Sequence, residues 1–365
     1  MTEKQLKFKR MGGPKPLVGL LVLAVSALAL SGCIFPEEEK EDTVFLTKVG
    51  GAEMVKGLGG TMDAFVGWEP FPAEAVIKGG KVLLKSSEIW EHHPCCVMAY
   101  RNKWFENTED AQDIVTRMVW AHKQATDWIN EAKDVNHKNH TKLVEYAVDF
   151  TQRNEEIVEL ALDNVDFDYA IGIDGIKEYG NVIYDKAEIM VEEKWDDSGY
   201  SSMDEYIDDV IDSSYIDSGF DPNVNLTEKK VRVGYISSDL HHLALWIIIG
   251  EGIGAKVNLD IETEHRSNGV YVMKELFRTG VVDMAYLGIA PAVIHGINSN
   301  DFTFNDARIE IVAGVNYNGS AIIVEKGIES IEDLAGKTVG YPGTGTVQWY
   351  LLLKALEEKN MKIAI

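Results

Sequence analysis

Cysteine is scarce in this chain. Three cysteines occur in 365 residues, at Cys33, Cys95 and Cys96, and the last two are adjacent. Neighbouring Cα atoms lie about 3.8 Å apart, which is below the span that a disulfide usually bridges. The sequence therefore excludes a small fold held together by disulfide bonds.

Basic residues are also in the minority. The chain has 35 lysines and arginines against 59 aspartates and glutamates, which gives a net charge of −24 at pH 7. Nucleic-acid binding needs a basic face that neutralises phosphates, and this composition does not supply one. We therefore expect no nucleic-acid partner, while the acidity itself favours solubility and says nothing about a ligand.

The common sequence signatures of enzymes are missing as well. The chain has no serine nucleophile elbow, no H-E-x-x-H and no C-x-x-C pair. The glycine-rich loop at 343–346 is not followed by the G-K-[ST] of a nucleotide-binding P-loop. These absences predict a protein that is not an enzyme, with no catalytic residues and no cofactor.

Residues 1–33 have the layout of an export signal. A basic start precedes the apolar run LVGLLVLAVSALA, and small residues lead to Cys33. The segment resembles a lipobox, which implies that Cys33 is lipidated and becomes the mature N-terminus; an uncleaved signal anchor is the alternative. In both cases we expect a body tethered at the extracytoplasmic face of the cell membrane, after an acidic linker at 34–42.

The rest of the chain predicts an α/β protein. Apolar strand-like runs alternate with helical patterns, most clearly after residue 231, and this alternation indicates largely parallel sheets flanked by helices. About 330 residues are more than one compact lobe usually holds, so the length favours two lobes. Composition sets apart a polar linker at 218–230, which separates a largely helical stretch before it from the clearer alternation of strands and helices that begins at 231.

Several motifs resemble one family of binding proteins. VGYISSDLHHLALWI, GVVDMAYLGIAPA, VAGVNYNGSAIIV and IEDLAGKTVGYPGTGTVQWYLLL are similar to the first half of periplasmic-type solute-binding proteins of ABC importers. The group in question takes up nitrate, bicarbonate, taurine, alkanesulfonates or thiamine-precursor pyrimidines, and includes NMT1-like proteins. MVKGLGGTMDAFVGWEPFPAEAV and SSEIWEHHPCCVMA resemble the second half of the same proteins, yet they come first in this chain.

The resemblance implies a two-lobed periplasmic-binding-protein fold, type II-like, with the chain order circularly permuted. The helices of the family's C-terminal part then fall in the middle of the chain. A truncated tandem of two copies is the alternative. If the order is permuted, residues 43–66 must pair with the strand around 337–341 in one sheet.

The family layout also divides the lobes. Residues 43–92 and 327–365 would form one lobe, and 93–217 with 231–326 the other. The chain would cross between the lobes near Val324–Gly327 and near Trp90–Pro94.

Closure of two lobes around a small ligand is the mechanism that the resemblance implies. The loop at 343–346 precedes a helix, so its backbone N–H groups and hydroxyls can hold an anion; a turn in which threonine caps the helix is the alternative. A core position is the alternative for Tyr286, and a cap of the next helix beside a buried Trp68 is the alternative for Glu69. The candidate ligand-binding residues are His241, His242, Tyr286, Gly288, Asn316, Ser320, Gly343, Thr344, Gly345, Thr346, Trp68, Glu69 and Cys95.

The stretch HHPCCVMAY at 92–100 raises the question of a metal site. Zinc ligands in structural sites are usually separated by two or more residues, and here the cysteines are adjacent. We therefore predict no metal site. Instead we expect Cys95 and Cys96 on opposite faces of an extended segment, with one thiol toward the cleft.

Together these features predict a membrane-tethered solute-binding protein of an ABC importer. It would capture a small anionic solute, namely a sulfonate or taurine, nitrate, bicarbonate or a pyrimidine-like molecule, and deliver it to the permease. Two alternatives remain open: a metal-binding or non-transport surface protein on the same fold, and a rearranged fragment without function.

Overall fold

The computed structural model describes residues 42–185, 198–297 and 308–364. The expected signal segment, Cys33 and nearly all of the acidic linker lie outside these ranges. Within them, no helix combines the length and the apolar character needed to cross a membrane. Contacts group residues 41–365 into one compact unit.

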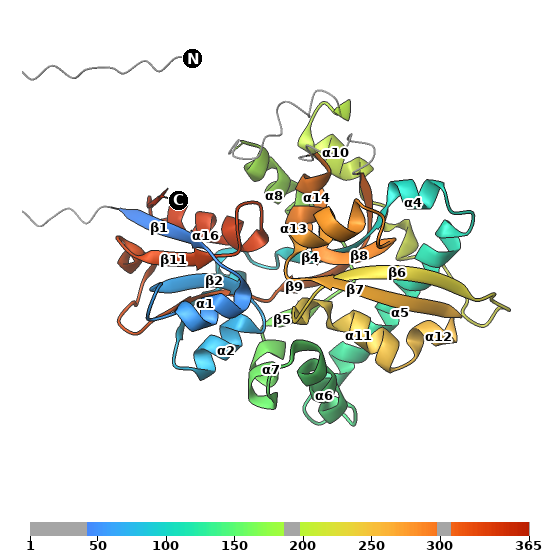
Figure 1. Ribbon diagram of the computed structural model, residues 1–365, viewed down its shortest axis with the longest axis horizontal. Helices are drawn as coiled ribbons and strands as arrows, with labels where there is room; N and C mark the ends of the chain where they lie inside the picture. The colour runs from blue at the N-terminus through green and yellow to red at the C-terminus, as the bar shows by residue number, and fades with distance from the viewer. Residues whose placement is uncertain (1–41, 186–197, 298–307, 365) are drawn as a thin grey trace, which may run out of the picture. The chain divides into compact units, whose positions relative to one another are not determined.

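The first sheet contains strands from both ends of the chain (Figure 1). Its order is β12-β1-β11-β2-β10-β3, and β10 is antiparallel to its neighbours while the other pairs are parallel. The strands span β1 Thr43–Lys48, β2 Ala64–Trp68, β3 Lys81–Lys85, β10 Ser320–Val324, β11 Thr338–Tyr341 and β12 Lys362–Ala364.

The pairing that a permuted order requires is present in this sheet. Phe45 lies opposite Thr338 and Lys48 opposite Tyr341 in parallel register. β11 also pairs with β2 on its other side, so a strand from the C-terminal end lies between two strands from the N-terminal end. The expectation for 43–66 is therefore confirmed, while the permutation itself stays a prediction.

The second sheet has the order β5-β9-β4-β8-β6-β7. β6 pairs in parallel with β7 and β8, whereas β4 is antiparallel to both β8 and β9. This sheet is less parallel than predicted, because β4 and β5 run against the other strands. Its strands are β4 Pro94–Arg101, β5 Val165–Phe167, β6 Lys229–Ile236, β7 Leu259–Arg266, β8 Met284–Gly288 and β9 Ile309–Asn318.

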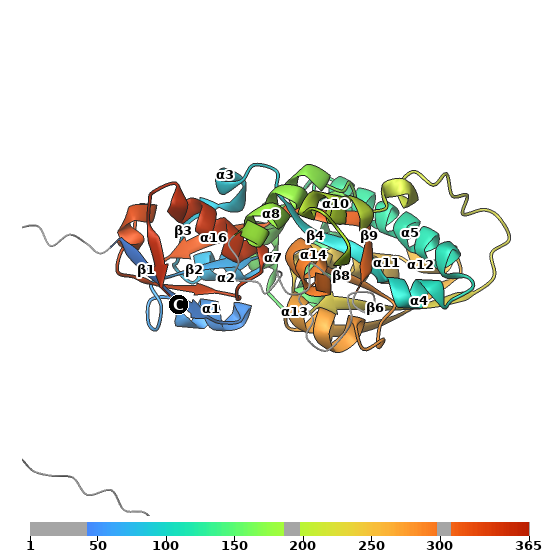
Figure 2. The same cartoon turned by 90° about the horizontal axis from the view of Figure 1, so that it is seen from above.

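Helices cover both sheets, which confirms the α/β class with two sheets flanked by helices. Around the second sheet, α5, α11 and α12 lie on one side and α13 with the adjoining π-helical turn η3 on the other (Figures 1 and 2). The helical elements are α1 Gly51–Gly57, α2 Phe71–Ile77, α3 Ser86–Ile89, α4 Asn102–Glu106, α5 Ala111–Ala132, α6 His140–Thr151, α7 Glu155–Leu162, α8 Ile173–Asp185, α10 Met203–Asp209, η1 Ser213–Tyr215, η2 Leu240–His242, α11 Leu243–Gly250, α12 Ile253–Lys256, α13 Gly269–Tyr271, η3 Val272–Phe277, α14 Ile289–Ile297, η4 Ile331–Leu334 and α16 Val347–Glu357.

Local sequence explains where the helices begin and which face they bury. In α5, Ile114, Met118, Ala121 and Ala125 recur at helical spacing, and all four are buried. At the start of α7 the Asn154 side chain accepts a hydrogen bond from the Ile157 N–H at 3.0 Å, as an N-cap should. These patterns confirm that residues 111–162, within the stretch expected to be largely helical, form helices.

One predicted crossing between the lobes lies elsewhere. The sequence placed it at Val324–Gly327, but β10 already belongs to the first sheet, so the chain crosses at Asn318 and Gly319. Both residues have positive φ, 57° and 85°, and this bend redirects the chain from one sheet to the other. The lobe boundary therefore precedes β10 instead of following it.

Glu310 on β9 gives the second sheet a pH-dependent stability. Burial raises the pKa of Glu310 to about 7, even though Arg308 and Asn102 favour the charged form. An acid whose pKa is raised by folding stabilises the protein below its unfolded pKa of about 4.5, and this stabilisation is lost as the pH rises through about 7.

We therefore expect Glu310→Gln to be neutral near pH 4.5 and stabilising by about 1–2 kcal/mol at pH 8, a range reduced for the partial exposure of the side chain. Urea unfolding of both proteins at several pH values measures the difference. A difference that stays constant with pH would contradict the assignment.

Candidate functional site

A cleft between the two sheets leads to a smaller inner cavity. The cleft has a volume of about 720 Å³, and the inner cavity has about 40 Å³. Both are lined by Trp68 at the end of β2, Asn268 after β7 and Pro342 after β11. The site thus lies beyond the carboxyl ends of strands from both sheets, where ligands of α/β proteins bind.

The two lobes contribute different chemistry to the inner cavity. The first-sheet lobe supplies Trp68 and the start of α16, and the second-sheet lobe supplies thiols, an imidazole and a carboxylate. The lining residues are Trp68, Pro342, Thr346, Val347 and Gln348 from the first, and Cys95, Cys96, Ile236, Asp239, His241, Asn268, Gly269, Gly288 and Pro291 from the second.

The cleft outside this cavity is more polar. Lys48 and Arg153 enter it from opposite lobes, and Ser237, Ser238 and Ser267 add hydroxyl groups. Arg153 is also bonded to Glu74 on α2, with its Nε 2.6 Å from the carboxylate. Cationic and hydroxyl groups of this kind suit a small anion.

His241 is held in one orientation by its neighbours. It lies in η2, where Asp239 accepts the His241 backbone N–H at 3.1 Å. The ring Nε2 donates to the carbonyl oxygen of Gly319 at 2.9 Å, since a carbonyl can only accept. The other ring nitrogen, Nδ1, therefore faces the Cys95 and Cys96 thiols, at 3.6 Å and 3.7 Å.

Burial and mutual charge shift the pKa of every group in this cluster. The hydrogen bond from Cys96, with the nearby His241, holds the pKa of the Cys95 thiol well below its usual value, whereas burial raises that of Cys96. Burial raises the pKa of Asp239 to about 7. Burial alone would lower the pKa of His241, but the charges of Asp239 and Cys95 raise it to about 9. Asp239 and Cys95 thus favour the protonated form of the His241 imidazole, and His241 in turn favours the thiolate form of Cys95.

The expectation that the two thiols lie on opposite faces is wrong. Both approach the same nitrogen of His241, and both line the inner cavity. The register of β4 against β9 shifts between Pro94 and Cys96 and again between Cys96 and Val97. Such a bulge breaks the strict alternation of a strand, so two consecutive side chains can face one side.

Five of the predicted residues do line the inner cavity: Trp68, Cys95, His241, Gly288 and Thr346. Thr346 has a structural role as well, because its hydroxyl accepts the Trp349 N–H at 3.2 Å and caps α16. Gly343, Thr344 and Gly345 do not line it, so the loop acts here as the threonine-capped turn that was the alternative.

The other predicted residues are engaged elsewhere. Glu69 is buried, accepts the Ala73 N–H at 3.1 Å at the start of α2, and accepts the Asn164 amide at 2.9 Å. Tyr286 is a core residue whose hydroxyl contacts His122 Nδ1 at 3.1 Å. Ser320 receives a hydrogen bond from Gln348 at 3.1 Å.

Two polar candidates lie behind the cavity wall. His242 Nδ1 accepts the Ile236 N–H at 3.1 Å, and the Asn316 amide donates to the carbonyl of Asn318 at 3.1 Å. Among the described residues, His242 Nε2 and Asn316 Oδ1 are buried without a hydrogen-bond partner. They support the residues of the site from behind.

Sequence reasoning missed Cys96, Asp239, Gln348, Lys48 and Arg153. Asp239 had a detectable signal, because it follows the end of β6 by three residues and precedes the candidate His241 by two, where an aspartate can cap a helical turn. Lys48 and Arg153 are far apart in sequence, and no local pattern relates them. Only the tertiary structure brings them to one cleft.

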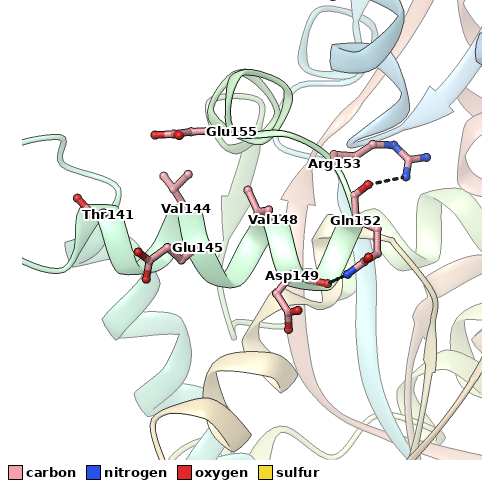
Figure 3. Close-up of a pocket in the computed structure, with 8 residues that line it drawn as sticks. All are labelled: Thr141, Val144, Glu145, Val148, Asp149, Gln152, Arg153 and Glu155. Carbon is pink, nitrogen blue, oxygen red and sulfur yellow. Dashed lines mark hydrogen bonds between the residues drawn. The ribbon is translucent and has the colours of Figure 1, made fainter.

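A second open hollow of about 660 Å³ lies along α6 and the start of α7 (Figure 3). Figure 3 shows the Gln152 side chain bonded to the carbonyl oxygen of Asp149 and the Arg153 side chain bonded to that of Gln152. None of the predicted site residues lines it. We therefore assign the functional site to the cleft between the sheets.

Comparison with known proteins supports the resemblance seen in the sequence. Residues 21–147 match the model of the NMT1-like family. This part of the chain is NMT1-like. The predicted likeness to this group of solute-binding proteins is thereby confirmed.

Curated relatives that match part of this chain come from Brucella. Proteins of Brucella abortus strain 2308 and Brucella suis biovar 1 strain 1330, both named as binding proteins, are each 32% identical over 146 residues. The match covers 40% of this chain and 42% of each relative, so the chain spans about two fifths of their length.

Solved structures give weaker likenesses. The periplasmic binding protein AgaA from A. tumefaciens R10, in complex with agropinic acid, is 12% identical with a TM-score of 0.34, over 87% of this chain and 59% of that one. The ABC transporter substrate-binding protein CtaP from Listeria monocytogenes is 10% identical with a TM-score of 0.30, over 75% and 52%.

Proposed function

We propose that this protein is the solute-binding component of an ABC importer. It captures a small anionic solute in the cleft between its lobes and delivers it to the permease, without chemistry of its own. Tethering through Cys33, or through an uncleaved anchor, would keep it at the extracytoplasmic face of the membrane. The NMT1-like sequence and the Brucella binding proteins support this proposal.

The observation that carries the proposal is a cleft lined from both sheets. Its volume of about 720 Å³ falls in the range of small-molecule sites. Three contacts join the lobes around it: the Glu69 carbonyl accepts the Leu240 N–H at 3.1 Å, Asn164 donates to Glu69, and Arg153 pairs with Glu74. Opening the lobes would break these contacts, and a solute bound between the lobes would favour the closed arrangement in which they form.

The position of the anion follows from charge. Lys48 and Arg153 face the outer cleft, whereas no lysine or arginine is among the described residues that line the inner cavity. We therefore place the anionic end of the solute between Lys48 and Arg153. Its remaining part would lie against the Trp68 ring.

Thermal-shift screening of the full chain against taurine, an alkanesulfonate, nitrate, bicarbonate and a hydroxymethylpyrimidine tests the proposal. A true solute at 100 times its dissociation constant should add about 2.7 kcal/mol of stability. Failure of every one of these solutes to stabilise the protein, with zinc alone stabilising it, would overturn the transport function.

Lys48→Met tests the placement of the anion. We expect it to weaken binding of the identified solute about tenfold, because a charge-assisted hydrogen bond of roughly 1.5 kcal/mol is lost. Lys56→Met on α1 is the matched control, since Lys56 is an exposed lysine that does not line the cleft. Equal affinities for the two variants in isothermal titration would refute the placement.

A further inference from the structure

The structure gathers Cys95, Cys96 and His241 more closely than packing requires. Their ligand atoms all lie within 4.8 Å of one another, and all three residues are buried. Cys95 and Cys96 are both free thiols. This convergence was not expected from the sequence, which argued against adjacent cysteines serving one ion.

We propose that Cys95, Cys96 and His241 form a binding site for a thiophilic cation, Zn²⁺ or Cu⁺, open toward the inner cavity. The proposal rests on this cluster alone and is independent of the transported solute.

The distances fit a shared tetrahedral ion. Zinc binds sulfur at about 2.3 Å and imidazole nitrogen at about 2.0–2.1 Å, so tetrahedral angles separate the two ligand atoms by about 3.6 Å. Here His241 Nδ1 lies 3.6 Å from Cys95 Sγ and 3.7 Å from Cys96 Sγ. The Oδ1 atom of Asp239 also lies close to this nitrogen, at 3.3 Å. One proton on Nδ1 cannot serve two thiols and a carboxylate at once, whereas one cation can attract all three.

The second ring nitrogen of His241 completes the arrangement. Imidazoles that bind metals usually donate their other N–H to a carboxylate or a backbone carbonyl, which fixes the ring. His241 Nε2 donates to the Gly319 carbonyl at 2.9 Å, so Nδ1 is the nitrogen directed to the thiols. Asp239 holds the backbone of the same residue.

A second grouping in the same region, Cys96 with Asp239 and His242, fits an ion less well. His242 Nδ1 accepts the Ile236 N–H at 3.1 Å, so in the neutral ring the proton is on Nε2. Neither nitrogen of His242 then has a free lone pair for a cation. The ligands are therefore Cys95, Cys96 and His241.

Charge and softness identify the class of ion. Thiolate ligands select Zn²⁺ and Cu⁺ over the oxygen-preferring Mg²⁺ and Ca²⁺. Binding would displace the protons that the ligand atoms carry to solvent. Two thiolates and a neutral imidazole then neutralise Zn²⁺ at a buried position, where unpaired charge is costly.

Three protein ligands leave a fourth position toward the inner cavity. That cavity, of about 40 Å³, holds roughly one or two water molecules. Zinc sites with three protein ligands keep such an open position for water or another small donor. The site would thus bind an exchangeable ion at the deep end of the solute cleft.

The test uses the full chain, prepared metal-free under reducing conditions. Titration with Co²⁺ should give thiolate-to-cobalt charge-transfer absorption that saturates at one equivalent and is abolished by Zn²⁺. A parallel titration with Cu⁺ against a chelator distinguishes the two ions. Absence of the charge-transfer band, together with no stoichiometric Zn²⁺ or Cu⁺ binding, would overturn the proposal.

Variants assign the ligands. Cys95→Ser and Cys96→Ser should each weaken binding by at least about 100-fold. Cys33→Ser is the matched control and should leave affinity unchanged, because the proposed set of ligands does not include Cys33, the chain's third cysteine. A charge-transfer band that survives in the Cys95→Ser, Cys96→Ser double variant would refute the site.

A measurement on the unmodified protein guards against misfolded variants. Zn²⁺ should protect two thiols per chain from a thiol reagent under mildly denaturing conditions; labelling at the same rate with and without Zn²⁺ would contradict the proposal. The solute screen is run on metal-free and Zn²⁺-loaded protein. If the protein binds the ion but none of the solutes, the transport function is refuted and the metal site stands. If it binds a solute but no ion, the metal site is refuted and the transport function stands.

Discussion

Gly319→Ala is expected to lower the free energy of unfolding by about 3 kcal/mol. Gly319 has φ of 85°, a conformation that costs a residue with a side chain about 1 kcal/mol. A Cβ there would also lie 2.3 Å from His241 Nε2 and 3.0 Å from Val165 Cγ2, so the imidazole must move. The variant should therefore lose both stability and the hydrogen bond that orients His241.

Gly327→Ala is the matched control for this experiment. Its φ of 97° imposes similar backbone strain, but a Cβ would meet nothing within 4 Å. We expect a loss of only about 1 kcal/mol and unchanged affinity for Zn²⁺. Denaturant unfolding and zinc titration of both variants provide the comparison. Equal losses of stability in the two variants would show that the His241 contact is unimportant.

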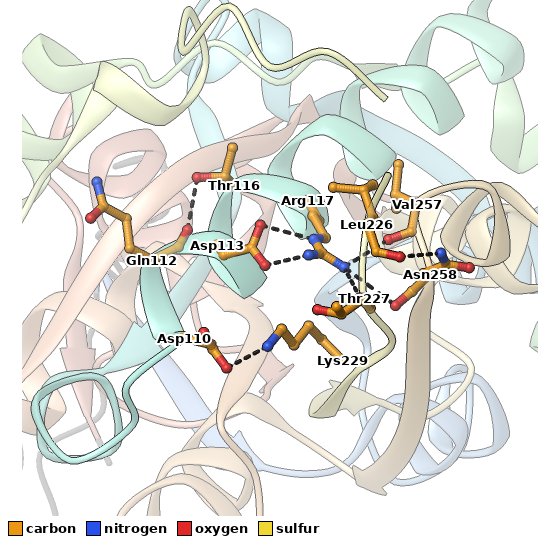
Figure 4. Close-up of polar contacts among 10 residues, drawn as sticks. All are labelled: Asp110, Gln112, Asp113, Thr116, Arg117, Leu226, Thr227, Lys229, Val257 and Asn258. Atoms are coloured by element: carbon orange, nitrogen blue, oxygen red, sulfur yellow. Dashed lines mark hydrogen bonds and ion pairs between the residues drawn. The ribbon is translucent and has the colours of Figure 1, made fainter. Parts of the chain in front are cut away.

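Arg117→Met should lower the free energy of unfolding by about 3 kcal/mol. The guanidinium is buried beneath the segment at 218–230 and bonds Asp113, with Nε to Oδ1 at 2.9 Å (Figure 4). It also donates to the carbonyl oxygens of Thr227 at 2.6 Å and Val257 at 3.1 Å. Methionine fills most of the volume but leaves those carbonyls without a donor, and each unsatisfied buried group costs about 1–3 kcal/mol.

Lys229→Met is the control, because Lys229 pairs with Asp110 in the same region of Figure 4 but at the surface, with the Asp110 side chain 52% exposed. Exposed ion pairs contribute about 0–1 kcal/mol, so this variant should differ little from the parent. Urea unfolding measures both. Equal losses of stability in the two variants would contradict the claim that Arg117 holds the 218–230 segment against α5 and the end of α12.

Much of the fold could be predicted because its signals are local. Alternating apolar strands and helical patterns indicated an α/β protein, and motif order indicated that the first and last strands share a sheet, as β1 and β11 do. The crossing between lobes was placed too late. In the sequence, SAIIV at 320–324 looks like a continuation of the strand before it. Only the pairing of this segment, β10, with β2 and β3 shows that the chain has already passed to the first sheet.

The site was harder to predict because its residues depend on departures from regular structure. Cys95 and Cys96 would face opposite ways in an ideal strand, and a shift in register, which is set by pairing with β9, turns both toward His241. Glu69 and Ser320 looked like ligand contacts, but each has a nearby partner that takes its hydrogen-bonding capacity. No periodicity in the sequence records such pairings.

By itself, the sequence determined the class of fold, the likeness to solute-binding proteins, the acidic character that argues against a nucleic-acid partner, and the strands whose ends face the cleft. The tertiary structure decided which side chains meet there: two thiols, an imidazole and a carboxylate at the deep end, and Lys48 with Arg153 outside. The physical reason is the distance along the chain over which each kind of interaction acts. Burial patterns and caps act over a few residues, whereas a binding site depends on contacts between segments more than a hundred residues apart, and those follow from sheet pairing alone.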